Sequence, residues 1–452
     1  MSILNTIGAD LEQVKDMIVD YTSRDTSILS MINISKVAEA SRHGYRIPFL
    51  IYRGGSYTKI SLDEGTLPTG TGPLNNYMVA GYIPSAFAIK LTDEQIRLSE
   101  SSEVNRYNVL SDIMANIMEE MIAHDNIHFL GNGNGWLTAV SSAKPSTTTL
   151  TFQTAGDNVG INWLRLGMAV DVWASDGTTL RIGGPYTITG LNWDSGIVTF
   201  NAAVTGLTSG DRLSVANVDE FGPSAPTTQS STWPAFATAA GLTGDSWRHG
   251  VQYVNDADTS LYYLQKLKSA YPQLVPQKVN LDGYALSWEA IEVLKNKAIQ
   301  ARDDKILSGQ MALMHLCQLD VLKESIVRIG RIDLNNNGGK MPDLPPQVDP
   351  MQVFNLVGMP AFASKLCDRS RVDFINPANW GRVQNGVPDY WRAPNVSGPV
   401  FMPVLGTGVY KTAWQAWVIN TFDWVCHDPG ASMYAYGAKV KAGYAPGSTW
   451  AP

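Results

Sequence analysis

Histidines at helical spacing are the first residues in the chain whose arrangement could do chemistry. His124 and His128 stand four positions apart, and Glu120 precedes them by one turn, so a helix would place all three side chains on one face. Imidazole and carboxylate groups arranged in this way could bind zinc. However, the HExxH pattern is missing, and the helix dipole by itself favours histidines near a helix C-terminus. We therefore expect a structural role and no metal site.

A polar segment later in the chain matches half of a calcium-binding loop. The residues from Asp333 to Gly338 follow the pattern D-x-N-x-N-G, which offers oxygen ligands around a tight turn. The twelfth position, where a bidentate Glu is required, is Leu344, and prolines stand where the exiting helix would begin. The sequence therefore favours a plain polar loop.

No other stretch supports catalysis or phosphate binding. The glycines of GNGNG (131–135) would follow a helix, whereas a phosphate loop precedes one and continues with Lys and Ser or Thr. The chain has no GxSxG motif, and Cys317, Cys367 and Cys426 are far apart and form no CxxC pair. We expect three buried thiols, no enzymatic activity and no cofactor.

Composition narrows the class of protein. The 452 residues carry a net charge of -7, and 44% of them are hydrophobic, enough for two or three structural units with sizeable cores. An acidic chain lacks the basic stripe with which a dedicated nucleic-acid binder replaces counterions. The sequence shows no secretory signal and no apolar run of about 20 residues, so we expect folding in a reducing cytoplasm and no membrane insertion.

Residues 91–135 form the element around which we expect the chain to be organised. Thr92 can cap a helix, with Gln95 three residues later as its reciprocal partner. Between Val104 and Ile122 apolar residues recur at steps of three and four, while acidic residues take the other side. Some thirty-odd helical residues within this element would span on the order of 50 Å. Such a rod suits an extended scaffold better than a compact enzyme.

The residues before this helix predict an arm and a hairpin. The first 40 or so residues contain a short amphipathic pattern and then polar, helix-compatible sequence that ends near Ser41. Two β-like runs follow at residues 45–60 and 77–90, and the turn formers between them, GTLPTGTGP, predict an extended hairpin. Because a two-stranded ribbon is marginal in water, we expect the hairpin to pack on another subunit.

An all-β module follows the helix. Between Ser141 and Val218 helical periodicity is nearly absent, which predicts a barrel or sandwich of about 75 residues inserted into the main domain. Trp163, Trp173 and Trp193 could line a sugar-binding surface, although packing in the module core is favoured. The expected strands lie at residues 150–152, 168–172, 180–182, 197–200 and 213–215.

The last section alternates helix and strand, which is typical of a sheet with helices on its faces. We expect helices over residues 261–270 and 287–299. We expect strands over residues 278–282, 352–357, 371–375 and 409–419. The fold class is therefore α+β.

The order of these parts resembles the major capsid protein of tailed bacteriophages. The resemblance is carried by EGTLPTGTG at the hairpin tip, AIKLTDEQIRLSES entering the helix, HDNIHFLGNGNGWLTAV leaving it, and FNLVGMPAFASKLCDRSRVDF further on. It implies an N-terminal arm (1–44), an extended loop (45–90), the spine helix of a peripheral domain (91–140) and an inserted all-β domain (141–219). It further implies a peripheral-domain linker (220–260), an axial domain (261–370), and the end of the axial domain with a return to the peripheral sheet (371–452).

This resemblance implies a non-enzymatic shell subunit. Hexamers and pentamers of the chain would build an icosahedral head in the host cytoplasm and become part of the virion, enclosing double-stranded DNA without sequence-specific contact. A portal protein would be a partner. Because the chain starts directly at the arm, a separate scaffolding protein is expected, while a cement or decoration protein stays open. The hairpin residues available for contacts between subunits are Arg53, Lys59, Asp63, Glu64 and Leu67.

Two other functions stay open on the sequence alone. A bacterial protein nanocompartment of the same fold would enclose enzymes instead of DNA. A hydrolase or carbohydrate-binding protein would use the β module, between Leu150 and Val215, to bind its ligand.

Calcium is expected to leave the thermal stability unchanged, because the loop after Asp333 lacks the bidentate Glu. Differential scanning fluorimetry at millimolar calcium, with magnesium as the matched ion and a chelator as the blank, measures the effect. A rise in Tm with calcium alone would contradict this expectation.

Overall fold

The structure is a computed structural model and has a mixed α+β fold, which confirms the predicted class. It describes residues 29, 32–36, 45–52, 72, 74–80, 83–92, 103–131, 137–140, 144–151, 160–175, 180–181, 184–192, 197–215, 249–264, 266–302, 309–324, 354–356, 359–384, 389–390, 401–405 and 410–441.

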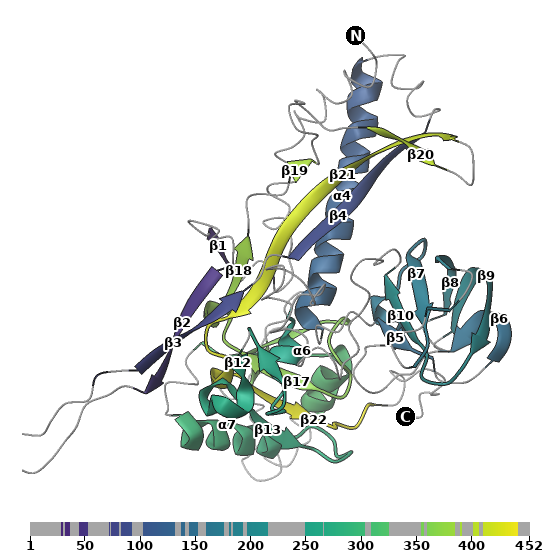
Figure 1. Cartoon of the computed structure of the whole chain (residues 1–452). Coiled ribbons are helices and arrows are strands. Elements are labelled where there is room, and N and C mark those ends of the chain that lie inside the picture. The colour runs from purple at the N-terminus through teal and green to yellow at the C-terminus, as the bar shows by residue number, and fades with distance from the viewer. Residues whose placement is uncertain are drawn as a thin grey trace, which may run out of the picture.

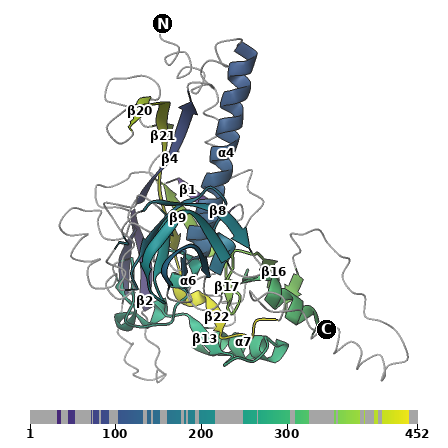
Figure 2. The ribbon, with the colours of Figure 1, turned by 90° about the vertical axis from the view of Figure 1, so that its right-hand side faces the viewer.

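A long helix, which we call the rod, is the most prominent element of the molecule (Figures 1 and 2). The helix α4 (Glu103–Leu130) lies along a sheet in which β21 is the central strand. The strands of this sheet are β1 (Asn33–Lys36), β4 (Ile83–Thr92), β18 (Trp380–Gln384), β19 (Asp389–Tyr390), β20 (Met402–Leu405) and β21 (Tyr410–Cys426).

The inner face of α4 is apolar, as predicted. Its side chains form one core cluster with side chains of β4 and β21, while Glu119 and Glu120 are exposed. Burial of such an apolar stripe stabilises a helix on a sheet. The buried members of this cluster are Ile89, Leu91, Ile117, Met118, Met121, Ala416 and Val418.

The predicted start of the helix at Thr92 is wrong. Thr92 is the last residue of β4 and pairs with Ala413 of β21. Ile89 and Leu91, two positions apart, point to one face and are buried under α4. Ten residues of pairing with a distant strand therefore outweigh a local capping pattern. At the other end α4 stops at Leu130, and the Gly131 N–H donates to the Ile127 carbonyl at 2.9 Å.

Both strands of the predicted hairpin are present, and residues 53–60 of the first predicted strand lie outside the described residues. β2 (Tyr45–Tyr52) pairs antiparallel with β3 (Leu74–Ala80). The predicted second strand at residues 77–90 is in fact two strands, because β4 leaves the hairpin and joins β21. The expectation that the hairpin has no support of its own is wrong for its base, which is buried in the body core through Ile47, Phe49, Met78 and Ala80.

The arm is strand-like where the structure describes it. Leu29 and Ile32 are buried in the same core as the hairpin base, and β1 pairs parallel with β18. Sheet pairing therefore replaces the helix-compatible interpretation for residues 33–36, and the rest of the predicted arm lies outside the described residues.

The segment predicted as an all-β module contains one six-stranded sheet in the order β5-β10-β7-β8-β9-β6, with a core of its own. Ile127 of α4 also belongs to that core. The predicted strand at 180–182 is wrong at Leu180, which makes only an isolated bridge to Trp173, and β8 was not predicted. The strands are β5 (Thr138–Ala139), β6 (Lys144–Thr151), β7 (Ala169–Trp173), β8 (Tyr186–Asn192), β9 (Ile197–Leu207) and β10 (Arg212–Val215).

A third six-stranded sheet, with the order β13-β22-β17-β14-β16-β15, is covered on one face by the helix α7 (Trp288–Arg302) (Figure 1). The predicted helix start at Ser287 is confirmed, since its hydroxyl accepts from the Ala290 N–H at 3.3 Å. The strands are β13 (Gln277–Asn280), β14 (Met311–Met314), β15 (Phe354–Leu356), β16 (Met359–Ala363), β17 (Val372–Ile375) and β22 (Met433–Tyr436).

The predicted helix at residues 261–270 is wrong. This segment forms a small ribbon, β11 (Tyr262–Tyr263) and β12 (Lys266–Leu267), followed by the 3-10 turn η3 (Lys268–Ala270). Leu264 between the two strands has a φ of 44°, which a right-handed helix does not allow. Tertiary contacts of Lys268, described below, explain why the segment leaves the helical path.

Aromatic rings fix the C-terminal end of α4 to the body. The Phe129 ring packs edge-on against Trp380 and Trp424, with centroids 5.1 and 5.2 Å apart. All three side chains are buried in the core cluster that also contains the hairpin base. The rod and the hairpin therefore share one core.

Phe129→Ala is expected to destabilise the chain by about 3–5 kcal/mol, because it leaves a cavity between two indole rings. Urea denaturation of the unassembled chain measures the change. Val293→Ala, on the exposed side of α7, is the matched control and should stay within about 0.5 kcal/mol. A loss below about 1 kcal/mol for Phe129→Ala would contradict this role of the ring.

Candidate functional site

The outer face of the hairpin base carries an exposed aromatic ring between two cations. Tyr77 is 47% exposed. The Arg46 guanidinium lies 5.0 Å from the centroid of the Tyr77 ring, and Lys266 Nζ lies 5.2 Å from it. Cations within about 6 Å of a ring centroid are attracted by its electron-rich face. We call Arg46, Tyr77 and Lys266 the hairpin-base face.

Lys266 reaches this face because the β11–β12 ribbon lies against the hairpin. The Val79 N–H of β3 donates to the Leu264 carbonyl at 3.3 Å. Lys266 Nζ donates to Asn76 Oδ1 at 3.3 Å, and Asn76 Nδ2 donates to the Tyr271 hydroxyl at 2.9 Å. Partial burial lowers the pKa of Lys266. The ribbon thus positions a cation that belongs to a different part of the chain.

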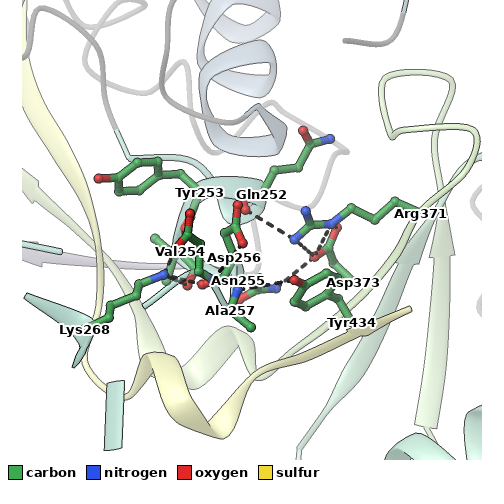
Figure 3. Close-up of polar contacts among 11 residues, drawn as sticks. Gln252, Tyr253, Val254, Asn255, Asp256, Ala257, Lys268, Arg371, Asp373 and Tyr434 are labelled. Carbon is green, nitrogen blue, oxygen red and sulfur yellow. Dashed lines mark hydrogen bonds and ion pairs between the residues drawn. The ribbon is translucent and has the colours of Figure 1, made fainter. Parts of the chain in front are cut away.

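The ribbon is held in turn by a buried ammonium group (Figure 3). Lys268 is fully buried, and its Nζ donates to the carbonyls of Tyr253 and Val254 at 3.3 and 3.1 Å and to that of Asp256. The first two carbonyls end the short helix α6 (Val251–Val254), where the helix dipole attracts a cation. Burial lowers the pKa of Lys268 to about 8, so the ammonium is still mainly charged at neutral pH.

An ion pair fixes the α6 loop to the third sheet (Figure 3). Arg371 grips Asp373 of β17 through Nε at 3.0 Å and Nη2 at 2.9 Å, and Nη2 also donates to the Gln252 carbonyl at 3.2 Å. The guanidinium lies 4.1 Å from the Tyr434 ring centroid. Asn255 Nδ2 donates to Asp373 Oδ1 at 3.1 Å. A bidentate, stacked arginine of this kind sets geometry as well as energy.

These contacts give the hairpin base a positioned surface for binding, without a reactive group. In the part of the chain that the structure describes, neither Arg46 nor Lys266 has a carboxylate at ion-pair distance. Among the same residues, no cluster of His, Cys, Asp and Glu is arranged to hold a metal ion. A cationic, aromatic face on a chain with a net charge of -7 is suited to a partner with acidic or aromatic side chains.

The residues predicted for subunit contact cannot be compared with this face. Arg53, Lys59, Asp63, Glu64 and Leu67 all lie outside the described residues, between β2 and β3. The predicted calcium-like loop from Asp333 to Gly338 also lies outside them.

The histidines of the long helix lie as the spacing predicts. His124 Nε2 is 3.9 Å from Glu120 Oε1, and the rings of His124 and His128 have centroids 6.4 Å apart. Phe87 of β4 packs edge-on against His124. The three side chains share one side of α4, where His124 contacts Phe87 of the neighbouring strand as well as Glu120 and His128.

The described cysteines and tryptophans have structural roles, as the sequence predicts. Cys317, Cys367 and Cys426 are free and buried. Trp163 is buried in the module core and Trp173 is half-buried, with its indole N–H donating to Ser214 Oγ at 2.9 Å. Trp193 lies outside the described residues. None of the described helices is long and apolar enough to cross a bilayer.

The hairpin-base face was not predicted from the sequence. Arg46 and Tyr77 alternate with buried apolar neighbours, Ile47 and Met78, and this period-2 pattern could have marked them as the exposed side of the hairpin. Lys266 gave no such signal, because Asn76, its neighbour on the hairpin, is 190 positions away in the sequence.

Comparisons with known proteins find similar solved structures at low sequence identity. No protein-family model matches the sequence, and no curated protein matches it. The chain resembles the capsid of cyanophage A-1(L) at 10% identity and a TM-score of 0.43, over 92% of this chain and 93% of that one. It resembles the capsid of an empty GTA particle at 9% identity and a TM-score of 0.42, over 92% and 91% of the two chains. It resembles the capsid of the Myoviridae phage XM1 at 9% identity and a TM-score of 0.40, over 91% of each chain.

Arg371→Met is expected to destabilise the chain by about 3–5 kcal/mol, because it leaves the Asp373 carboxylate buried without its partner. Urea denaturation of the purified chain measures the loss. Combining Arg371→Met with Asp373→Asn removes both charges and should recover more than half of it. Equal instability of the single and double variants would contradict the ion-pair explanation.

Proposed function

We propose that this chain is a structural subunit of an icosahedral viral head that assembles through hexamers and pentamers. The observation that carries the proposal is the hairpin. Its base is buried in the body core, while its outer face presents Tyr77 between two cations. The strands are joined by 21 residues, those between Tyr52 and Leu74. We infer that this connecting segment lies on a second copy of the chain.

The rod supports the same function. α4 has 28 residues and so measures about 42 Å, and one face of it is committed to the β4–β21 sheet. A subunit that must span a wide area of a thin shell needs a stiff element of this kind. Large interfaces built from extended elements also need no reactive group, in keeping with a structural protein and no catalysis.

The partners follow from this proposal. They are many copies of the same chain, a separate scaffolding protein, a portal protein, and packaged double-stranded DNA held without sequence-specific contact, with a cement or decoration protein as an optional addition. The protein would assemble in the host cytoplasm and reside in the virion. The acidic charge of the chain fits enclosure of DNA better than tight binding to it.

A protein nanocompartment would use the same subunit contacts and differs from a viral head in what the shell encloses. Shells purified from the native source and treated with nuclease should protect DNA in the first case and enclose an enzyme in the second. The carbohydrate-binding alternative loses support, because Trp163 is buried and its indole N–H is used within the chain.

Deleting residues 66–73 is expected to leave a folded, soluble subunit that no longer forms stable shells, because the tip of the hairpin can no longer reach a neighbour. Negative-stain imaging and sedimentation velocity measure the outcome, after co-expression with the scaffolding protein.

An eight-residue Gly/Ser replacement of the same segment is the matched control, since it keeps the length and removes the side chains. Shells from the replacement but not from the deletion would assign the effect to reach. Normal shells from the deletion would overturn the proposed role of the hairpin.

A further inference from the structure

The rod covers one face of the sheet that β4 and β21 form (Figure 2). Side chains alternate between the two faces of a strand, and Ile89, Leu91 and Val418 lie in one core cluster with α4. In the part of the chain that the structure describes, α4 is the one helix that shares a core cluster with β4. We call the opposite face of this sheet the open face.

The open face is apolar at its centre. Ala86 and Ala88 of β4 are exposed, and the register sets them opposite Ile419 and Trp417 of β21, which are half-buried. Short side chains on one strand thus lie beside large ones on the next. Met402 of β20 continues this face through its register with β21 and is 39% exposed. Covering such a face with further apolar side chains would be stabilising.

An apolar stripe that could cover it stands near the start of the sequence, outside the described residues. Four apolar residues recur there at steps of four, three and four, so a helix over residues 7–18 would carry them on one side and Asp16 on the other. A helix of 12 residues is about 18 Å long and is marginal in water by itself. From Ala86 to Thr92, β4 extends over a similar length, about 20 Å. The residues of the stripe are Ile7, Leu11, Val14 and Ile18.

The chain enters the same sheet shortly after this segment, so the segment can reach the open face. Asn33 of β1 pairs with Gly381, which pairs with Val425 of β21. Trp417 is eight positions from Val425, about 27 Å along the strand. Residues 19–32 can span more than about 40 Å when extended. A tether of this length also makes binding within one chain more favourable than binding to a second copy in dilute solution.

Charged residues border the two surfaces in a complementary way. Lys90 of β4 is exposed at one side of the open face, and Asp389 of β19 lies at the other side, in register with Ile419. In a helix, Asp10 and Lys15 would flank the apolar stripe on its two sides. One orientation of the helix would set Asp10 on the side of Lys90 and Lys15 on the side of Asp389. Charge pairs at such a border select an orientation and add little affinity.

We propose that residues 7–18 fold as an amphipathic helix on the open face of their own chain and cover its apolar centre. The occupant is a segment of this chain, and the site is the centre of the face, formed by Ala86, Ala88, Trp417, Ile419 and Met402. The docked helix belongs to the unassembled chain, so the proposal is independent of shell formation.

The first test measures how well the helix shields the open face. The full chain carries Ala88→Cys, and a maleimide labels the new thiol in dilute solution, with peptide mass spectrometry to separate it from the three buried cysteines. Leu11→Asp combined with Val14→Asp breaks the apolar stripe. This pair should raise the labelling rate at position 88 at least about 10-fold, because a helix docked for about nine-tenths of the time leaves one tenth of the chains reactive.

The matched control is Ala9→Asp combined with Gln13→Asp. It adds the same two charges at nearly the same spacing, but on the side of the helix that faces away from the stripe, so the rate at position 88 should stay low. A thiol introduced by Val293→Cys, on the exposed side of α7, should react equally in all backgrounds. Equal rates at position 88 with the intact and the broken stripe would overturn the proposal.

The second test identifies the chain that supplies the helix. Leu11→Cys and Ala88→Cys are combined, and unlabelled and nitrogen-15-labelled chains are mixed before a short bismaleimide is added. Crosslinked peptides should join halves of the same isotope. Peptides that join different isotopes would place the helix on a second copy and overturn the proposal.

The unsubstituted chain gives a third measurement should a variant fail to fold. Hydrogen exchange at residues 7–18 should be slowed at least about 10-fold relative to an unstructured peptide, since a docked helix protects its amides. Exchange at the rate of the unstructured peptide would overturn the proposal.

Discussion

The structure depends on a charge buried where the rod meets the sheet. Arg382 of β18 is 1% exposed, and its guanidinium lies 3.8 Å from the centroid of the Phe422 ring. Nη2 donates to Asn420 Oδ1 at 3.0 Å, and Nη1 is 3.8 Å from Asp125 Oδ2 on α4. Burying a charge is costly unless partners surround it, so the helix and the strands can approach only in the arrangement that supplies them. The rod therefore has one position on the sheet.

Two further buried polar clusters fix the relative positions of other parts of the structure in the same way. Lys268 and Arg371 join the α6 loop, the β11–β12 ribbon and the third sheet, and through Lys266 they determine what the hairpin base presents. Asn162, His315 and Arg369 join the β module to the body. Each cluster connects segments that are far apart in the sequence. Buried polar groups are used here to fix the relative positions of large parts of the chain.

The parts of the fold that the sequence predicts are those with a local pattern. The stripe through Ile117 and Met121, the alternation of the module strands and the cap at Ser287 all depend on neighbours within a few residues, and the structure confirms them. Thr92 has an equally good local pattern and was predicted wrongly, because β21, more than 300 positions later, takes the segment as a strand. The helix predicted around Lys268 is wrong for the same reason, because tertiary contacts hold this segment as a ribbon.

The candidate site depends almost wholly on contacts between segments that are far apart in the sequence. Tyr77 and Arg46 could be placed on the outer face of a hairpin from their alternation with buried residues, but Lys266 comes to them only through the tertiary contacts of Leu264 and Lys268. The surroundings of His315 are of the same kind, since Asn162, 153 positions earlier, lies beside its ring. A site formed by segments that are far apart in the sequence gives no recognisable pattern in either segment alone.

The most direct measurement of the central claim is electron cryo-microscopy of the full chain, expressed alone and together with the proposed scaffolding protein. A shell subunit predicts closed particles in which the residues after Tyr52 of one copy lie on a neighbouring copy, with α4 and the β4–β21 sheet repeated across the shell. Monomers or small closed oligomers under all conditions, with the hairpin folded back on its own chain, would contradict it.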